Sequence, residues 1–315
     1  MHILPGPLRR AGRRTAALGA ALPLLALALT GCGSGPRAGG GPPAAANPIA
    51  SVHEVPSVAA LLPASVRSSG VLDLVSSVGA PPSAYYPNGD SGTVAGQDID
   101  FGNAVAAVLG LRVQRQEGAF DTVLPGLQSG KWQVGTGNFG VTETREKTVD
   151  FVTYIDDGQG FAVAGGSPIK KITKLTDLCG LTVGTGQGTT FQATLEQNAD
   201  VCAKAGRKPF QVKVYSDTAA VLLGLQQGRF DVLFSTINGL RYQQQATGGA
   251  VRFLNGFHRL DVGFAFAKGS PLTRAFQAAV NELIKDGTYQ RILRKWGTTA
   301  SAITRSRISP PELTD

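Results

Sequence analysis

The sequence predicts an α/β protein made of two similar lobes. Segments typical of strands and helices alternate between residues 70 and 134, which indicates a mostly parallel sheet covered by helices. A pattern of helix, glycine, basic residue, aromatic residue and strand occurs twice, at Val123–Val134 and at Val221–Val232, with an offset of 98 residues. Ligands of such sheets bind at the carboxyl ends of the strands. Two facing lobes therefore predict a cleft, with Asn138 and Thr236 as corresponding strand ends.

The first 31 residues have the pattern of a secretion signal. Four arginines precede the apolar stretch Ala16–Leu29, which is too short to span a membrane comfortably. The stretch runs into Leu29-Thr30-Gly31-Cys32, which resembles a bacterial lipobox. We expect residues 1–31 to be a lipoprotein signal peptide and Cys32 to be lipidated. The pair Arg13-Arg14 leaves twin-arginine export open beside the general route.

Residues 32–57 should form a flexible tether, because they are mostly rich in Gly, Pro and Ala with few large apolar side chains. No later run is long and apolar enough to cross a membrane. We therefore expect a lipid-anchored protein on the extracytoplasmic face of the cell membrane.

Composition bounds the function. The 315 residues suffice for two domains, and the content of 42% hydrophobic residues excludes wholesale disorder. The net charge of +8 includes the four arginines of the signal; without residues 1–31, 26 basic residues face 22 acidic ones. The remaining charges are scattered and do not predict a nucleic-acid surface. We expect a monomer without a nucleic-acid partner.

The N-terminal part of lobe 1 should occupy residues 58–157. Turn residues and hydrophobic spacing place its elements, with Asp100 expected as a helix cap and Gly110 as the end of that helix. The predicted elements are a helix at Val58–Val66, a strand at Gly70–Val75, a helix from Asp100, a strand at Leu111–Val113, a helix at Phe120–Ser129 and a strand at Lys131–Val134.

The stretch Gly135–Phe151 is the first candidate site. Its glycines at positions 135, 137 and 140 predict a turn that allows close approach to bare backbone. Thr142 or Thr144 should start a short helix that carries Arg145. Backbone N–H groups and a guanidinium can together bind a carboxylate. The alternative is a surface turn in which Arg145 pairs with a neighbouring glutamate.

Lobe 2 should occupy residues 158–255, and residues 256–300 should return to lobe 1. A Gly/Thr loop after the strand Leu181–Gly184 opens a helix and offers a second set of N–H groups to an anion. Asp217 or Thr218 should cap the next helix. The later predicted elements are a helix at 219–227, a strand at Gly263–Phe266, helices at Leu272–Leu283 and Gly287–Trp296, and a loose tail within residues 301–315.

Two cysteines, Cys179 and Cys202, remain after the lipobox. An even pair outside the cytoplasm favours a disulfide, and two free buried thiols are the alternative. No histidine lies near them in the sequence, so we expect no metal site and no cofactor.

Several motifs then occur in a fixed order: Gly96–Asp100, Leu127–Lys131, Val141–Arg145 with Val149–Phe151, Gln187–Thr190, Gly228–Asp231, and Asp286–Tyr289 with Lys295–Gly297. Together they resemble the bacterial extracellular solute-binding proteins of family 3, the polar amino-acid receptors of ABC importers. The resemblance covers about Leu61 to Gly297. It implies a two-lobed, periplasmic-binding-protein-like fold of type II, with a hinge and with lobe 2 inserted in the middle of lobe 1.

The resemblance also implies a ligand site. Arg145 matches the arginine that holds the ligand α-carboxylate, and the backbone near Gly140 and Thr190 assists it. Phe120 matches the aromatic residue that packs on the ligand. With the strand ends, the expected ligand-binding residues are Phe120, Asn138, Gly140, Arg145, Thr190 and Thr236.

Three positions depart from the family pattern. Thr236 stands where an aspartate usually holds the ligand ammonium, Gly140 stands where a serine or threonine is usual, and Ser83 replaces an aromatic residue. A buried ammonium without a carboxylate is costly. Either the ligand lacks a free ammonium, or a carboxylate from elsewhere replaces the missing one, with Asp156, Asp157 and Asp217 as the candidates.

The function expected from these features is capture of a small polar solute without chemistry. Two alternatives stay open. Some relatives of these receptors are dehydratases of cyclic acids, which need a general acid in the cleft; the histidines are His2, His53 and His258, and no catalytic cluster is visible. A sensory subunit is the other alternative.

Overall fold

A single mixed sheet of eight strands organises the computed structural model, which describes residues 47–89 and 92–313. The strand order is β2-β1-β3-β8-β4-β7-β5-β6. The strands are β1 Val71–Ser76, β2 Arg112–Glu117, β3 Val134–Gly140, β4 Val149–Ala164, β5 Thr182–Gly186, β6 Gln211–Tyr215, β7 Val232–Thr236 and β8 Val251–Ala267. The expected signal peptide, Cys32 and the expected tether up to residue 46 lie outside the described residues.

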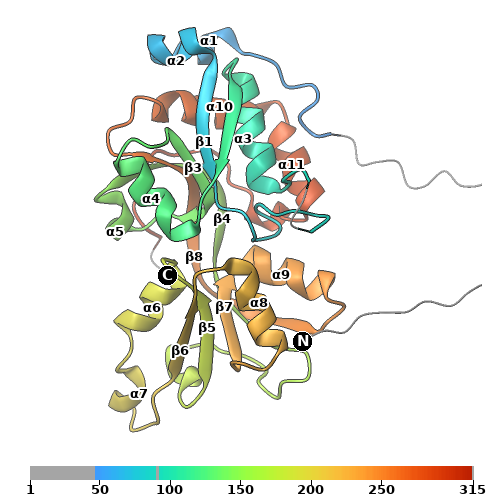
Figure 1. The fold of residues 1–315 in the computed structure, drawn as a ribbon, viewed down its shortest axis with the longest axis vertical. Helices are drawn as coiled ribbons and strands as arrows, with labels where there is room; N and C mark the ends of the chain where they lie inside the picture. Colours follow the sequence, from blue (N-terminus) through green and yellow to red (C-terminus); the bar gives the residue numbers. More distant parts are fainter. Residues whose placement is uncertain (1–46, 90–91, 314–315) are drawn as a thin grey trace, which may run out of the picture. The chain divides into compact units, whose positions relative to one another are not determined.

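Two lobes share this sheet. The parallel strands β1, β2 and β3 belong to lobe 1, and the parallel strands β5, β6 and β7 belong to lobe 2. The long strands β4 and β8 pair antiparallel from Val149↔Ala267 to Ala164↔Val251 and run through both lobes (Figure 1). The two expected sheets are therefore joined into one. The expected lobe limits at residues 157 and 255 fall inside β4 and β8 and stay predictions.

Helices cover the sheet in both lobes (Figure 1). Lobe 1 carries α1 Pro56–Ala59, α2 Ala64–Ser69, α3 Gln97–Val108, α4 Phe120–Gln128, α5 Glu143–Glu146, α10 Thr273–Lys285, α11 Thr288–Trp296 and the 3-10 turn η2 Thr299–Ser301. Lobe 2 carries the 3-10 turn η1 Leu175–Leu178, α6 Thr190–Gln197, α7 Val201–Lys204, α8 Thr218–Gln226 and α9 Ile237–Ala246. None of the helices in the described ranges combines the length and the hydropathy that a membrane crossing requires.

The repeated sequence pattern is a repeated structure. In lobe 1, α4 leads into β3, and a Cβ atom placed on Gly126 would lie 2.2 Å from the buried ring of Trp132. In lobe 2, α8 leads into β7, and a Cβ atom on Gly224 would lie 2.8 Å from the buried ring of Phe230. Each pair is separated by the offset of the sequence repeat, so the same helix–aromatic contact is built twice.

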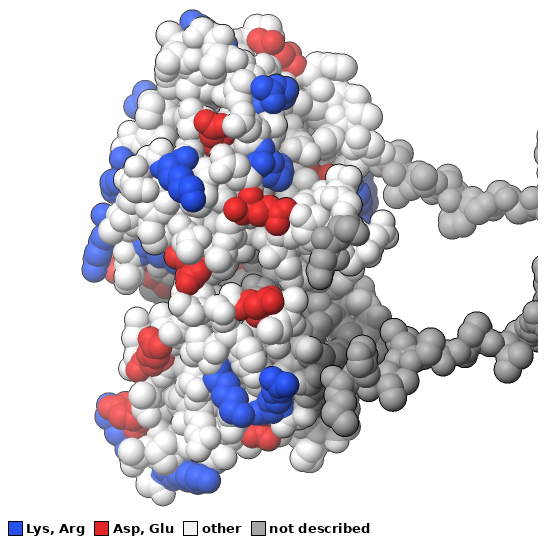
Figure 2. All heavy atoms as spheres, in the orientation of Figure 1, with Lys and Arg blue, Asp and Glu red and all other residues white. Residues whose placement is uncertain are grey.

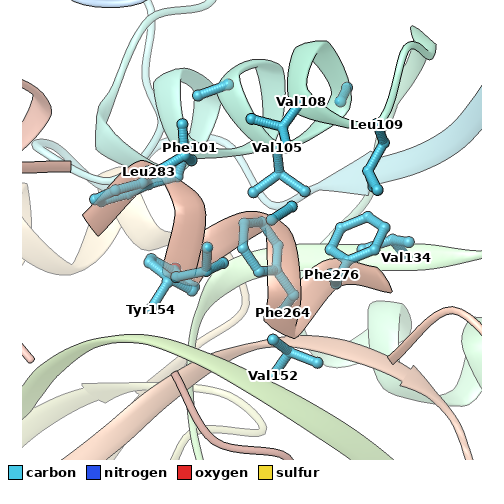
Figure 3. Packing of buried hydrophobic residues seen from close by; sticks show 14 of the residues in the cluster. Phe101, Val105, Val108, Leu109, Val134, Val152, Tyr154, Phe264, Phe276 and Leu283 are labelled. Carbon is cyan, nitrogen blue, oxygen red and sulfur yellow. The ribbon is translucent and has the colours of Figure 1, made fainter. Parts of the chain in front are cut away.

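The largest core belongs to lobe 1. Phe101 and Val105 on α3 face Phe264 on β8 and Phe276 on α10 (Figure 3). Because α10 lies late in the chain, this core joins the two ends of the sequence. Lobe 2 has smaller cores, one of which stacks Phe161 on Phe234 with ring centroids 4.3 Å apart.

Several predicted elements differ from the structure. The helix predicted to start at Asp100 starts at Gln97 after Gly96, where a Cβ atom would lie 2.0 Å from the Ser83 carbonyl oxygen. Asp100 is instead bound by Lys295 Nζ and Trp296 Nε1, both at 2.7 Å. The single helix predicted at 58–66 is two short helices, α1 and α2.

The glycine-rich stretch also differs from its prediction as a turn. Residues 135–140 continue β3, which pairs with β8 on one side and with β1 on the other. The glycines give room to neighbours: a Cβ atom at Gly135 would lie 2.6 Å from Val123. The short helix predicted next is confirmed as α5, and Thr142 rather than Thr144 caps it by accepting from the Arg145 N–H group.

Both ends of the described chain pack on lobe 1. Val52 and Val58 join its core, and the Val55 N–H group donates to the Val108 carbonyl oxygen at 2.9 Å. The folded body therefore begins before residue 58, within the stretch expected as tether.

The C-terminal tail was expected to be loose, but residues 302–313 form a strap along β4. Ser306 Oγ donates to the Thr153 carbonyl oxygen at 2.6 Å, and Arg307 forms an ion pair with buried Asp261 at 2.5 Å. Short polar stretches with two prolines are common in loose tails, and only these distant partners distinguish this one.

The predicted disulfide is present in lobe 2, where Cys179 is bonded to Cys202. It ties the end of η1 to the short helix α7. On the surface, basic and acidic side chains are interspersed over the face that Figure 2 shows.

Candidate functional site

A cavity of about 360 Å³ lies where the two lobes meet. Lobe 1 contributes the ends of β1 and β3 and the start of α4, and lobe 2 contributes the ends of β5 and β7 with the helices that follow them. This is the carboxyl edge of both parallel strand sets, where such folds bind ligands. All six residues expected at the site line the cavity: Phe120, Asn138, Gly140, Arg145, Thr190 and Thr236.

Arg145 is the single charged residue among the described residues that line the cavity. Its guanidinium donates to the carbonyl oxygens of Gly140 at 2.9 Å and of Gly188 at 3.1 Å. No described carboxylate lies within ion-pair distance, so the pairing with a neighbouring glutamate is absent. Burial lowers the pKa of Arg145 to about 10, against the opposing charge of Glu312. The side chain therefore stays a cation at neutral pH, with N–H groups that no described acceptor takes.

Aromatic rings surround this cation. The guanidinium carbon lies 5.8 Å from the ring centroid of Phe120 and 5.9 Å from that of Phe139. The two rings pack on each other with centroids 4.7 Å apart. An arginine held over aromatic faces keeps a fixed orientation, which suits a planar carboxylate.

Gly140 leaves little room for the hydroxyl side chain that its position in the family usually carries. A Cβ atom there would lie 2.9 Å from Leu260 Cδ1 and 3.7 Å from Thr190 Cγ2. Leu260 lies on β8, so the departure at Gly140 is matched by a bulky neighbour on another strand. The cavity wall at this point is bare backbone.

Two buried carboxylates fix Asn138. Its backbone has φ 54°, in the left-handed region, and its N–H group donates to Asp98 Oδ2 at 2.9 Å. Its side-chain Nδ2 donates to Asp157 Oδ2 at 3.0 Å. Burial raises the pKa of Asp98 and that of Asp157 to about 6 each. Since an ionised carboxylate only accepts hydrogen bonds, Asp157 orients the amide, and Asn138 Oδ1 has no partner among the described residues.

Thr236 closes the opposite side of the cavity. Its hydroxyl oxygen accepts from the Gly239 N–H group at 3.0 Å and so caps α9. The N–H group of Asn238, in the first turn of α9, donates to Asp157 Oδ1 at 3.1 Å. Asp157 therefore binds a strand of lobe 1 through one oxygen and a helix of lobe 2 through the other.

The three carboxylates proposed as ammonium partners do not line the cavity. Asp156 pairs with Arg259 at 3.1 Å. Asp157 is 1% exposed and already holds two donors. Asp217 caps α8 by accepting from the Ala219 N–H group at 2.8 Å.

Hydrogen bonds also cross the cleft between the lobes. Gln187 Nε2 of lobe 2 donates to Asp121 Oδ2 of lobe 1 at 3.0 Å. The Tyr242 hydroxyl donates to that of Tyr85 at 3.1 Å, and burial raises the pKa of Tyr85. These contacts hold the two lobes against each other around the cavity.

Sequence reasoning missed part of the lining. Tyr85 and Tyr86 come from the loop after β1, and Gln187, Tyr215 and Gln243 come from lobe 2. The signal available for the first two was a pair of tyrosines shortly after Pro81-Pro82-Ser83, in the loop that follows a strand. Ser83, where the family pattern has an aromatic residue, lies beside them in the lining.

The described lining of the cavity has few titratable groups. Among the described residues it contains no histidine and no carboxyl group. Its titratable groups are Arg145 and three tyrosines, at positions 85, 86 and 215.

Comparison with known proteins gives a consistent result. Residues 72–299 match the model of the bacterial extracellular solute-binding proteins, family 3. The chain is 30% identical over 266 residues to the arginine-binding protein ArgT of Corynebacterium glutamicum, covering 82% of this chain and 84% of that protein. It is 28% identical over 219 residues to the L-cystine-binding protein TcyJ of Escherichia coli K12, covering 69% and 78%.

Solved structures show the same fold. An ancestral arginine-binding protein bound to arginine matches with a TM-score of 0.64 and 31% identity, covering 72% of this chain and 98% of that one. The ancestral amino acid-binding protein AncCDT-1, described as a precursor of cyclohexadienyl dehydratase, matches with a TM-score of 0.65 and 25% identity, covering 74% and 97%.

Proposed function

Because the chain belongs to the bacterial extracellular solute-binding proteins of family 3, we propose that it captures a small carboxylate-bearing solute and delivers it to an ABC importer. The solute class is an amino acid or an amino-acid derivative. One observation carries the proposal: Arg145 is a cation without a described carboxylate partner, at a cavity that both lobes line. A ligand that touches both lobes stabilises their contact, which is how such proteins signal occupancy.

Each of the six proposed binding residues contacts a different part of the ligand in this proposal. Arg145 grips the carboxylate, with bare backbone at Gly140 and the start of α6 at Thr190 beside it. Phe120 packs on the ligand body, while Asn138 of β3 and Thr236 at the end of β7 offer neutral polar groups. The placement of all six in one cavity supports these roles.

An enzyme on the same scaffold has less support. The relatives and structures compared above are named as binding proteins, including the dehydratase precursor. The described lining supplies no histidine or carboxyl group for proton transfer. We therefore keep capture without turnover as the proposed activity.

Arg145→Ala tests the proposal. A thermal-shift screen of amino acids, their 2-hydroxy and N-acetyl analogues and other small carboxylates selects the strongest ligand. In calorimetry, Arg145→Ala should weaken that ligand by about 2–5 kcal/mol, because it removes a charge-assisted pair in a cleft. The ligand affinity of Arg145→Lys should lie between those of the wild type and of Arg145→Ala, since lysine keeps the charge but lacks the planar guanidinium.

Arg274→Ala is the matched control, because Arg274 is an exposed lobe 1 arginine that does not line the cavity. Its affinity should equal that of the wild type. Unchanged affinity in Arg145→Ala would refute the carboxylate role.

We also propose that the protein is a lipoprotein on the extracytoplasmic face of the membrane, anchored through Cys32. The support is the charged and apolar leader that ends in the lipobox-like Leu29–Cys32. In cell fractionation, Cys32→Ser should leave the membrane fraction or accumulate as uncleaved precursor. A processed variant that still carries lipid would show that another residue is the anchor.

A further inference from the structure

The charge of the cavity limits what can occupy it. Arg145 supplies one positive charge, and no residue of the described lining supplies a negative one. A ligand carboxylate pairs with Arg145. An ammonium or guanidinium on the same ligand would have no carboxylate to meet, and an unpaired charge away from water is costly.

The part of the lining that comes from strands β3 and β7 is neutral. Ser235 and Thr236 end β7, and Asn138 lies two residues before the end of β3 in lobe 1. The Thr236 hydroxyl already accepts from Gly239 N–H, at the N-terminus of the ten-residue helix α9. The dipole of a helix N-terminus favours negative charge and opposes a cation. A hydroxyl cannot neutralise a cation in that position.

Three carboxylates near the cavity already have partners. Asp157 accepts from Asn138 and Asn238, Asp156 is paired with Arg259, and Asp121 accepts from Gln187. Moving any of them toward the ligand would break a contact that joins the lobes or the hinge strands. The described part of the lining therefore stays neutral while these contacts are kept.

The rest of the lining suits a neutral body. Phe120, Phe191, Phe234, Leu222 and Leu240 contribute apolar surface, and Gln187 and Gln243 contribute neutral amides. Such walls bury hydrocarbon favourably and leave no charge to be matched.

We propose that the solute is a monoanion: a small monocarboxylic acid whose remaining groups are neutral, with a hydroxyl or an acylated nitrogen where an amino acid has its ammonium. Thr236 is the residue that sets this preference. The inference rests on the proposed function, since it assigns the charge of the solute that Arg145 binds.

Matched ligand pairs test the charge preference in the wild-type protein. The probes are three pairs: L-phenylalanine and L-phenyllactate, L-leucine and L-2-hydroxy-4-methylpentanoate, and L-glutamine and N-acetyl-L-glutamine. L-Arginine is a further single probe. Calorimetry at one pH and salt concentration should show the monoanion binding at least tenfold more tightly in any pair that binds. An amino acid that binds as tightly as its monoanionic partner overturns the inference.

Thr236→Asp should reverse the preference. Aspartate is also a good N-cap, so α9 should keep its start while the cavity gains the negative charge that an ammonium needs. In Thr236→Asp, the amino acid of the pair that binds should have at least tenfold higher affinity than its monoanionic partner. Thr236→Asn is the neutral control of the same shape, and it should keep the wild-type order.

The outcomes separate the two proposals. If carboxylates bind and Arg145→Ala abolishes binding, but Thr236→Asp leaves the preference unchanged, the proposed function stands and the charge inference fails. If no carboxylate in the panel binds the wild type, both fail.

Discussion

Lobe 1 and lobe 2 repeat one structural unit and finish it differently. In both, a helix ends at a glycine, an aromatic ring packs under a glycine of that helix, and a strand follows. In lobe 1, that strand leads to Asn138 and then to Arg145. In lobe 2, it leads to Thr236, which caps α9 and lines the cavity without a charge. The repeat therefore supplies the cleft, and the residues after each strand supply its chemistry.

The lobes also differ in what they bury. The buried carboxylates among the described residues are Asp98, Asp100, Asp157 and Asp261, and all lie in lobe 1 or on the connecting strands. Lobe 2 buries neutral polar groups such as Thr185 and Asn238, and it alone carries the disulfide. Among the described residues, lobe 2 outside the connecting strands thus buries no carboxylate.

The first test of this difference removes the buried carboxylate of Asp157, and it has the larger expected effect on stability. Burial raises the pKa of Asp157 from 3.8 to about 6, with Asn138, Asn238 and Arg259 opposing the rise and Asp156 adding to it. The folded state then binds the proton more tightly than the unfolded state. This contribution to stability is fully present below pH 4 and is lost as the pH rises through 6.

Asp157→Asn should remove that dependence. A shift of this size corresponds to roughly 3 kcal/mol between pH 4 and pH 7. The amide can still accept from Asn238 N–H, and a flip of the Asn138 amide satisfies its new donor. Urea unfolding at several pH values should show that the free energy of unfolding changes less with pH in the variant than in the wild type.

Asp200→Asn in lobe 2 is the control, because Asp200 is an exposed partner of Lys204. Its free energy of unfolding should change with pH in the same way as that of the wild type. Parallel curves for Asp157→Asn would mean that the buried charge does not distinguish the lobes.

The paired glycines give a smaller and more direct test. Gly126→Ala places a methyl group 2.2 Å from the Trp132 ring, which Gln116 holds through a 3.0 Å hydrogen bond. Overpacking of this kind costs about 1–3 kcal/mol, and alanine returns about 1 kcal/mol of helix propensity. We expect Gly126→Ala to lower the free energy of unfolding by up to about 2 kcal/mol.

Gly224→Ala should stay within about 1 kcal/mol of the wild type, because its closest neighbours are the edge of Phe230 and the end of the Tyr215 side chain, both at 2.8 Å. A double-mutant cycle with Trp132→Leu isolates the contact at Gly126. Equal effects at the two glycines would show that the repeated contact tolerates a methyl group equally well in both lobes.

The sequence predicts those parts of the fold that depend on neighbouring residues. Thr142 at the start of α5, Asp217 at the start of α8 and the limits of α4 are local signals, and the structure confirms them. The two-lobed α/β fold followed from the repeat and from family motifs. The six predicted site residues share a cavity for the same reason, and their ligand roles stay predictions.

What the sequence does not predict depends on partners far along the chain. Asp100 looked like a helix cap until Lys295 and Trp296 supplied its hydrogen bonds. The glycines of β3 looked like a turn because their neighbours on β1 and β8 are distant in sequence. Asp157 gave no signal of its link between the lobes, since neither Asn138 nor Asn238 lies beside it.

The strap along β4 fixes the order in which a nascent chain can complete its lobes. Lobe 2 has all of its strands once β8 has been synthesised. Lobe 1 starts earlier in the sequence, but its core waits for Phe276 and Tyr289, and its last contacts wait for Ser306 and Arg307. The lobe that begins first is therefore the one that finishes last, and until then the face of α3 that packs on α10 lacks its cover.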